Sequence, residues 1–181
     1  MMKVIEEMKE EERAMKKIMF NDKFGLTQAV LDGRKTMTRR LEAPYIVNEV
    51  IAIAQSYETL ANSGYLDQIM DGPLSMKKEY AGAGYKNKMF VKAELMPRHI
   101  KITHIGVERL QDISDEDCLR EGIRKWDKDG NPLGPSYDFV NSPHGYATPR
   151  EAFAALIDKV SGKGTWESNP LVWVCEFKLV D

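Results

Sequence analysis

The chain has 181 residues and a formal net charge of −2, with 43% hydrophobic and 30% charged side chains. This composition is typical of a folded globular domain, and a chain of this length can bury a core without a disulfide or a metal ion. The net charge excludes a polycation, so any affinity for nucleic acid must come from locally concentrated charge. No apolar run approaches the length of about 18–20 residues that a membrane-spanning helix needs.

The cysteines and histidines do not indicate a metal site. Cys118 and Cys175 lie far apart in the sequence, and none of the three histidines forms a pair at metal-binding spacing. No glycine-rich nucleotide-binding loop is present either, so we expect neither a metal nor a cofactor. Two free thiols are typical of a reducing compartment, and the amino terminus lacks the apolar region of a signal peptide. We therefore expect a cytoplasmic protein without a membrane partner.

The amino-terminal residues differ in composition from the rest. Residues 1–17 are rich in Glu, Lys and Met, and their spacing predicts a charged helical N-terminal extension. Binding to a partner, formation of a homodimer and fraying are the three alternatives for this helix. We expect residues 18–181 to form one domain with surface insertions at about 56–87 and 124–147.

Apolar runs and capping signals predict the secondary structure in chain order. Strands are expected at residues 18–20, 51–54, 88–94, 100–107 with a bulge near 104–105, and 171–180. Helices are expected at residues 24–32, before Gly33 in a left-handed conformation, at 114–121, and at 151–160 after a capping box from Thr148 to Glu151. Strands interleaved with short helices favour an α+β fold, which we expect to be a small, curled, mixed β-barrel flanked by short helices.

The segment from Gly33 to Arg40, GRKTMTRR, concentrates four cations and two hydroxyls without an acid. Because it follows the end of a predicted helix, we expect it to lie on a loop that runs into a strand. Guanidinium and ammonium groups beside hydroxyls suit a polar or anionic ligand. A solvated basic turn is the alternative, since charge runs usually lie at the surface.

A lysine beside a hydroxyl suggests proton transfer. The amine can take a proton from the hydroxyl if burial or nearby cations lower the pKa of the lysine, and Lys35 has Arg34, Arg39 and Arg40 around it in the sequence. A carboxylate from elsewhere would orient such a pair. Glu121 is a candidate because it closes a predicted helix and a glycine follows it, although a solvated acid at a helix end is the alternative.

The pattern Gly33-x-Lys35-x-x-Thr38-x-Arg40 resembles the signature of the ASCH family, Gly-x-Lys-x-x-Glu-x-Arg, within the PUA-like superfamily of β-barrels. The helix before this signature, the segment 113–122 and the terminal strand 172–177 are similar to elements that occur in the same order in that family. Residues 18–180 thus look like its phage-associated branch. Thr38 stands where many members have glutamate.

The resemblance implies a modified nucleoside or RNA as ligand. A bacterial ASCH branch hydrolyses the acetyl amide of N4-acetylcytidine, and its motif carries Gly-Arg-Lys-Thr-x-Thr, as here. By position, Lys35 would be the general base, Thr38 the nucleophile and Glu121 the assisting carboxylate. On a regular strand, residues three apart point to opposite faces, so this mechanism requires an irregular backbone at the motif.

A non-catalytic RNA-binding module, or an RNA-cleaving ASCH protein, is the alternative. In that case Arg34, Arg39 and Arg40 would contact phosphates, and Tyr85 or Trp126 would stack on bases. Such binding would depend strongly on salt concentration.

Overall fold

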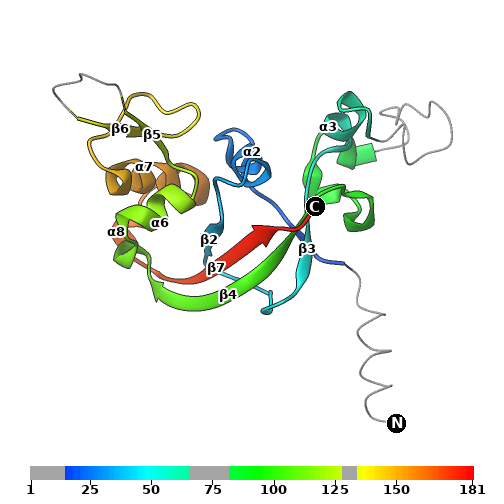
Figure 1. Cartoon of the computed structure of the whole chain (residues 1–181), viewed down its shortest axis with the longest axis horizontal. Coiled ribbons are helices and arrows are strands. Elements are labelled where there is room, and N and C mark those ends of the chain that lie inside the picture. The colour runs from blue at the N-terminus through cyan, green and yellow to red at the C-terminus, as the bar shows by residue number, and fades with distance from the viewer. Residues whose placement is uncertain (1–14, 66–81, 128–133) are drawn as a thin grey trace, which may run out of the picture. The chain divides into compact units, whose positions relative to one another are not determined.

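The computed structural model describes residues 15–65, 82–127 and 134–181 (Figure 1). These residues form two compact units. Within the described ranges, one comprises residues 15–19, 50–65 and 82–97, and the other comprises residues 20–49, 98–127 and 134–181. The predicted N-terminal helix, with the dimer contact assigned to it, falls almost entirely on residues 1–14, outside the described residues. Parts of both predicted insertions, at 66–81 and 128–133, also lie outside them.

The smaller unit contains two parallel strands, β1 (Lys17–Ile18) and β3 (Val50–Ile53). Helix α3 (Tyr57–Asn62) begins after Ser56, whose hydroxyl accepts a hydrogen bond from the backbone N–H of Thr59. Three 3₁₀ turns follow, namely η1 (Gly82–Tyr85), η2 (Lys88–Phe90) and η3 (Ala93–Leu95). The core of the smaller unit contains a cluster of Ala52, Ala54, Tyr57, Leu60, Val91, Ala93 and Met96.

The strand predicted at 88–94 is wrong, because η2 and η3 occupy these residues. The backbone groups that a strand would use for pairing already have other partners. The side chain of Asn87 accepts from the N–H of Met89, and Lys17 Nζ donates to the carbonyl oxygens of Met89 and Val91. A lysine about seventy residues away thus occupies two of the acceptors that strand pairing would need.

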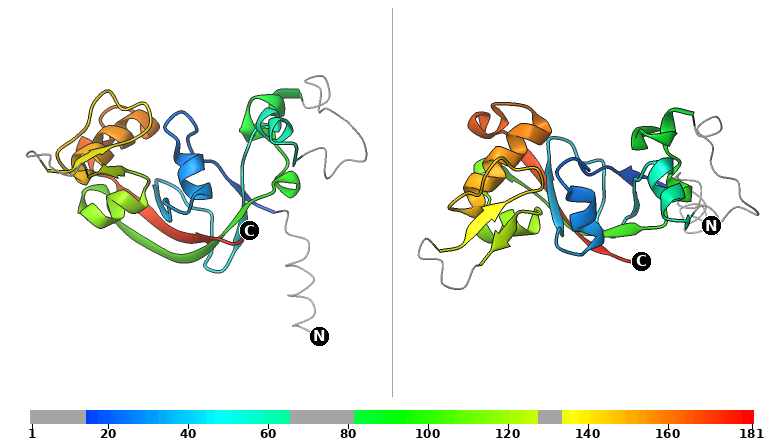
Figure 2. Two further views of the ribbon diagram at one scale, coloured as in Figure 1. Left: turned by 45° about the horizontal axis from the view of Figure 1, so that its top comes forward. Right: turned by 90° about the horizontal axis from the view of Figure 1, so that it is seen from above.

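The larger unit contains three antiparallel strands, β2 (Met37–Arg40), β4 (His99–Arg109) and β7 (Leu171–Leu179). β7 pairs with β2 on one side and with β4 on the other. The two long strands run side by side in every view (Figures 1 and 2). The register of β4 shifts between Ile102 and His104, which confirms the predicted bulge.

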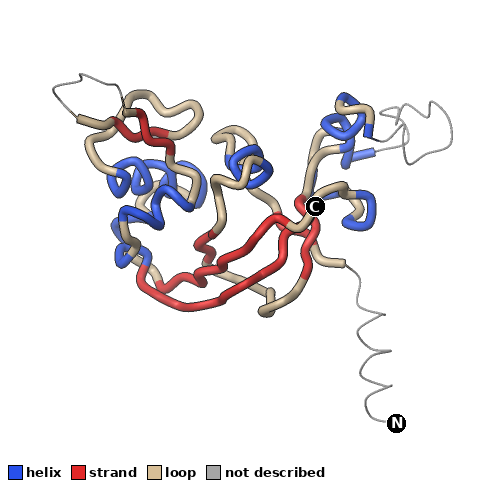
Figure 3. The backbone as a smooth tube through the Cα atoms, in the orientation of Figure 1, coloured by secondary structure: helices blue, strands red, loops and turns tan. Residues whose placement is uncertain are grey.

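Helices and a small second sheet complete the larger unit (Figure 3). The remaining elements are α2 (Leu26–Leu31), η4 (Leu110–Asp112), α6 (Asp115–Arg120), β5 (Arg124–Trp126), β6 (Ser136–Asp138), α7 (Pro149–Ser161) and α8 (Thr165–Ser168). The predicted capping box of α7 is confirmed, since Thr148 and Glu151 bond reciprocally across the first turn. α7 packs against both α6 and α8.

The predicted curled barrel is wrong. The described strands form one mixed five-stranded sheet and a separate two-stranded sheet of β5 and β6, so the fold is α+β with an open sheet. A barrel requires its two edge strands to pair. Here the edge strands β1 and β2 have only two and four residues, and the described residues contain no ladder between them. None of the helices in the described ranges has the length and hydropathy needed to cross a bilayer.

Candidate functional site

Four polar side chains selected from the sequence are buried in the larger unit. Lys35 is 2% exposed, Thr38 and Arg39 are 6% exposed, and Glu121 is 5% exposed. Lysine, arginine and glutamate are almost never buried to this degree unless they are paired with an opposite charge. Their partners therefore decide what this cluster can do.

Lys35 lies on irregular backbone between α2 and β2. α2 ends at Leu31 with Asp32 as its C-cap, and Gly33 follows with a φ of 73°, a left-handed conformation that glycine adopts without a steric penalty. The N–H of Lys35 then bonds to the carbonyl of Ala29 over 2.8 Å, and β2 begins only at Met37. Lys35 is consequently not part of the strand that contains Thr38.

The amine of Lys35 contacts Glu121, which lies 86 residues further along the chain. Lys35 Nζ is 2.5 Å from Glu121 Oε2 and 2.8 Å from the main-chain oxygen of the same residue. Gly122 follows with a φ of 107°, and a Cβ atom there would lie 3.2 Å from Leu26 Cδ2 and 3.7 Å from Lys35 Cδ. Glycine at this position thus permits the sharp turn that brings the end of α6 against Lys35.

Burial lowers the pKa of Lys35 below its ordinary value. The carboxylate of Glu121 opposes this effect, and the positive charges of Arg40 and Arg39 reinforce it. The amine therefore loses its proton more readily than an exposed lysine does, which is the property that a general base needs.

Arg39 is enclosed by carboxylates. Its Nε is 2.7 Å from Glu108 Oε1, its Nη2 is 3.1 Å from Asp117 Oδ2, and its Nη1 is 3.3 Å from Glu121 Oε1. Burial by itself lowers the pKa of Arg39, but the carboxylates, Glu121 foremost, raise it above the ordinary value. The structure places this guanidinium in the interior, where it positions Glu121 and is not open to a ligand phosphate.

Asp117 shows why the sequence did not reveal the whole network. Ser114 Oγ accepts from the N–H of Asp117 over 3.1 Å, as expected of a helix N-cap. The carboxylate of Asp117 accepts from Arg39 and from Arg120 Nη1 at 3.2 Å. Arg120 also binds Glu176 Oε2 at 2.5 Å. No local pattern marks these long-range partners.

Thr38 is not hydrogen-bonded to Lys35 or Glu121. β2 pairs with β7 in an unbroken register, and successive side chains of a strand point to opposite faces, so Thr38 and Arg40 face away from Arg39. Within the described ranges the Thr38 hydroxyl has no hydrogen-bond partner. The Arg40 guanidinium lies 5.6 Å from the Phe20 ring centroid, and Lys35 Nζ lies 5.8 Å from it.

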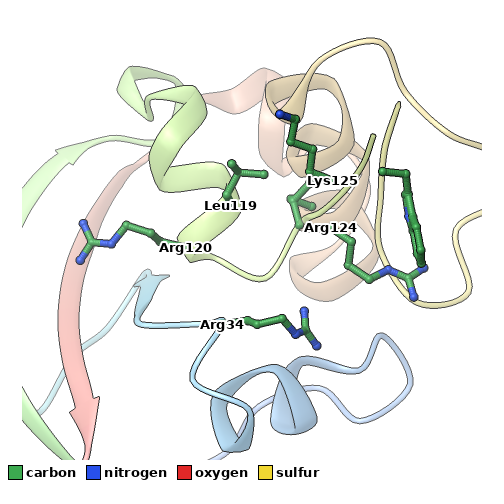
Figure 4. Close-up of a pocket in the computed structure, with 7 residues that line it drawn as sticks. Arg34, Leu119, Arg120, Arg124 and Lys125 are labelled. Carbon is green, nitrogen blue, oxygen red and sulfur yellow. The ribbon is translucent and has the colours of Figure 1, made fainter. Parts of the chain in front are cut away.

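A cavity of about 590 Å³ lies beside this network in the larger unit (Figure 4). Its lining consists of Arg34, Leu119, Arg120, Ile123, Arg124, Lys125 and Trp126. Arg34 and Trp126 were selected from the sequence as ligand-binding residues, whereas Arg120, Arg124 and Lys125 were not. Tyr85, also selected, lies in η1 of the smaller unit and does not line this cavity.

Within the described ranges no group of three or more His, Cys, Asp or Glu residues could hold a metal ion. Comparisons of the chain with protein-family models, with curated proteins and with solved structures found no match. The similarity to the ASCH family therefore depends on the sequence motifs alone.

Proposed function

We propose that the larger unit binds a ligand that contains a nucleobase, such as a modified nucleoside or RNA, in the cavity beside Trp126. The observation that supports this proposal is the cavity lining, which combines four cations with an indole ring. Arginine and lysine are suited to phosphate, and aromatic rings stack on bases. The volume of about 590 Å³ also lies within the range of small-molecule sites. The ASCH-like motif, which includes Arg34, points to the same class of ligand.

The test is binding of a fluorescently labelled single-stranded RNA to the full-length protein, followed by anisotropy at increasing salt. Binding is expected at low salt and should weaken as salt rises, because phosphate contacts release counterions. Arg124→Gln is expected to reduce the affinity. Lys178→Gln serves as the matched control, because it removes an exposed cation of β7 that does not line the cavity. Absence of binding at low salt, or equal losses in both variants, would contradict the proposal.

Amide hydrolysis is a second candidate function, and the contact between Lys35 and Glu121 favours it. In this reaction the neutral amine takes a proton from the nucleophile, the nucleophile oxygen bonds to the amide carbon, and the C–N bond breaks. The leaving amine receives the proton from the Lys35 ammonium, and Glu121 stabilises the positive charge meanwhile. Thr38 is the nucleophile by resemblance; a water molecule activated by the same pair then hydrolyses the acyl ester on Thr38, which releases the carboxylate and restores the hydroxyl. Direct attack by water is the alternative, because Thr38 makes no hydrogen bond to the pair.

Turnover of N4-acetylcytidine to cytidine, followed by its absorbance change, tests this second function. Lys35→Arg keeps a positive charge but cannot act as a base at neutral pH, so it should abolish turnover. Thr38→Val distinguishes the two candidate nucleophiles. Turnover should be lost if the Thr38 hydroxyl is the nucleophile and should persist if a water molecule is. Absence of turnover by the wild-type protein, or unchanged turnover by folded Lys35→Arg, would exclude this mechanism.

A further inference from the structure

We propose that the cavity selects a phosphorylated ligand, with Trp126 stacking on the base and with Arg34 binding the phosphate in place of a carboxylate of the protein itself. The ligand class is then a nucleotide, free or within a strand, in preference to a nucleobase or a nucleoside. This inference rests on the proposed binding function and specifies its ligand.

Each of the four cations that line the cavity has a carboxylate partner. The pairs are Arg34 Nη2 with Asp32 Oδ2 at 3.3 Å, Lys125 Nζ with Asp127 Oδ2 at 2.9 Å, Arg124 Nε with Asp138 Oδ1 at 2.8 Å, and Arg120 Nη2 with Glu176 Oε2 at 2.5 Å. A neutral ligand gains little from cations that are already paired. An anion can exchange with the carboxylates, and the ease of that exchange depends on how exposed each pair is.

Two of the pairs are partly buried and act as fixed parts of the wall. The side chains of Arg124–Asp138 and Arg120–Glu176 are between 22% and 34% exposed. Figure 4 shows the Arg120 guanidinium directed toward β7, away from Arg34. Arg120 therefore supports the wall and does not reach the phosphate.

The second fixed cation, Arg124, prepares a stacking platform. Its guanidinium carbon lies 5.3 Å from the centroid of the Trp126 ring, a distance typical of a cation–π contact. Trp126 is still 49% exposed, so it retains a large area for stacking on a planar base. A ring held by a neighbouring guanidinium loses less freedom when a base binds than a free ring does.

The other two pairs are exposed and can exchange. The side chains of Arg34 and Asp32 are 44% and 42% exposed, and those of Lys125 and Asp127 are 44% and 61% exposed. Ion pairs of this exposure contribute little to stability, whereas contacts of a guanidinium or ammonium with a phosphate are strong. Asp32 Oδ1 also accepts from Gln28 Nε2 at 2.7 Å, so this carboxylate keeps a partner when Arg34 turns to a ligand.

The exchangeable cations come from two separate elements. Arg34 projects from the segment before β2, while Lys125 belongs to β5 across the opening (Figure 4). Figure 4 shows the Lys125 side chain directed away from Arg34. Lys125 and Trp126 are successive residues of β5, whose side chains point to opposite faces, so the phosphate beside a base stacked on Trp126 is bound by Arg34. In this arrangement Asp32 competes with the ligand for Arg34.

This competition predicts opposite effects for neighbouring variants. Titrations of the full-length protein with CMP and with cytidine, by calorimetry and by quenching of tryptophan fluorescence, provide the test. CMP should bind about tenfold more tightly than cytidine, the difference expected for one charged contact. Arg34→Gln should weaken CMP binding by about tenfold and should weaken cytidine binding much less, because cytidine carries no phosphate. Asp32→Asn should tighten CMP binding, because it removes the charge that competes for Arg34.

The outcomes separate this inference from the proposed function. Equal affinity for CMP and cytidine overturns the selection of a phosphate but keeps the nucleobase site, whereas absence of binding for both ligands overturns the proposed function as well. Inorganic phosphate that binds as tightly as CMP, together with unchanged CMP binding in Trp126→Ala, overturns the stacking role. Weaker CMP binding in Asp32→Asn contradicts the competition. The dinucleotide CpC, compared with CMP, distinguishes a phosphate within a strand from a terminal phosphate, and binding of either one agrees with the inference.

Discussion

Replacing Glu121 by glutamine tests the buried charge network most directly. The substitution removes the negative charge that faces Lys35 Nζ at 2.5 Å and Arg39 Nη1 at 3.3 Å. Breaking a buried ion pair on one side typically costs about 3–5 kcal/mol of folding free energy, because a charge is left uncompensated. Arg39 keeps Glu108 and Asp117, and Lys35 keeps the main-chain oxygen of residue 121, so we expect a loss of about 3 kcal/mol, the lower end of that range.

Urea unfolding followed by far-ultraviolet circular dichroism measures this loss, provided that the slope of the transition is unchanged. The double variant Lys35→Met/Glu121→Leu removes both charges and should be less destabilised than the sum of the two single variants. Glu176→Gln is the matched control, because its pair with Arg120 is about one-third exposed and should contribute no more than about 1 kcal/mol. A loss below about 1 kcal/mol in Glu121→Gln, or strictly additive losses in the double variant, would refute the reasoning.

Three further predictions concern protonation, thiol reactivity and capping. Because the pKa of Lys35 is lowered in the folded protein, the unfolded chain binds more protons at Lys35. The free energy of unfolding of the wild type, relative to that of Lys35→Met/Glu121→Leu, should therefore rise toward pH 10.5 and fall as the pH drops through the lowered pKa. A pH series of urea titrations that shows a constant difference between the two proteins would contradict this. Burial raises the pKa of Cys118 from 9.0 to about 12, so at pH 8 its thiolate fraction should be about a thousandfold lower than that of an unfolded thiol, and Ellman's reagent should react only after denaturation. Thr148→Ala should cost about 1 kcal/mol in thermal unfolding and Thr148→Ser much less, since serine keeps the cap of α7.

The elements whose signals are local were predicted from the sequence. Gly33 ends α2 in a left-handed conformation, the bulge in β4 lies where the apolar alternation slips, and Thr148 with Glu151 caps α7, because each feature depends on a few adjacent residues. The placement of Lys35 beside Glu121 agrees with the site inferred from the resemblance, and their chemical role stays a proposal.

The features that depend on distant parts of the chain were not predictable in this way. Closure of a sheet depends on pairing between its edge strands, and no local pattern reports that. Two carbonyl oxygens at residues 89 and 91 accept hydrogen bonds from Lys17, about seventy residues earlier in the chain, so they are not free for strand pairing. Asp117 has the sequence position of a capping residue, while its carboxylate serves Arg39 and Arg120. Arg124 and Lys125 look like ordinary surface cations until β5 brings them to the cavity.

The main-chain oxygens of Arg120 and Glu121, at the end of α6, accept hydrogen bonds from the segment that precedes β2. The N–H of Thr36 donates to the carbonyl oxygen of Arg120 over 3.0 Å, and Lys35 Nζ donates to the carbonyl oxygen of Glu121 over 2.8 Å. Carbonyl groups at a helix end usually bond to water or to a following turn. A movement of the helix along its own axis would break both bonds, so these bonds oppose a displacement of the wall formed by Leu119 and Arg120. A ligand larger than the cavity would have to displace β5 instead. The rate of amide hydrogen exchange should then change more in β5 upon binding than at Thr36.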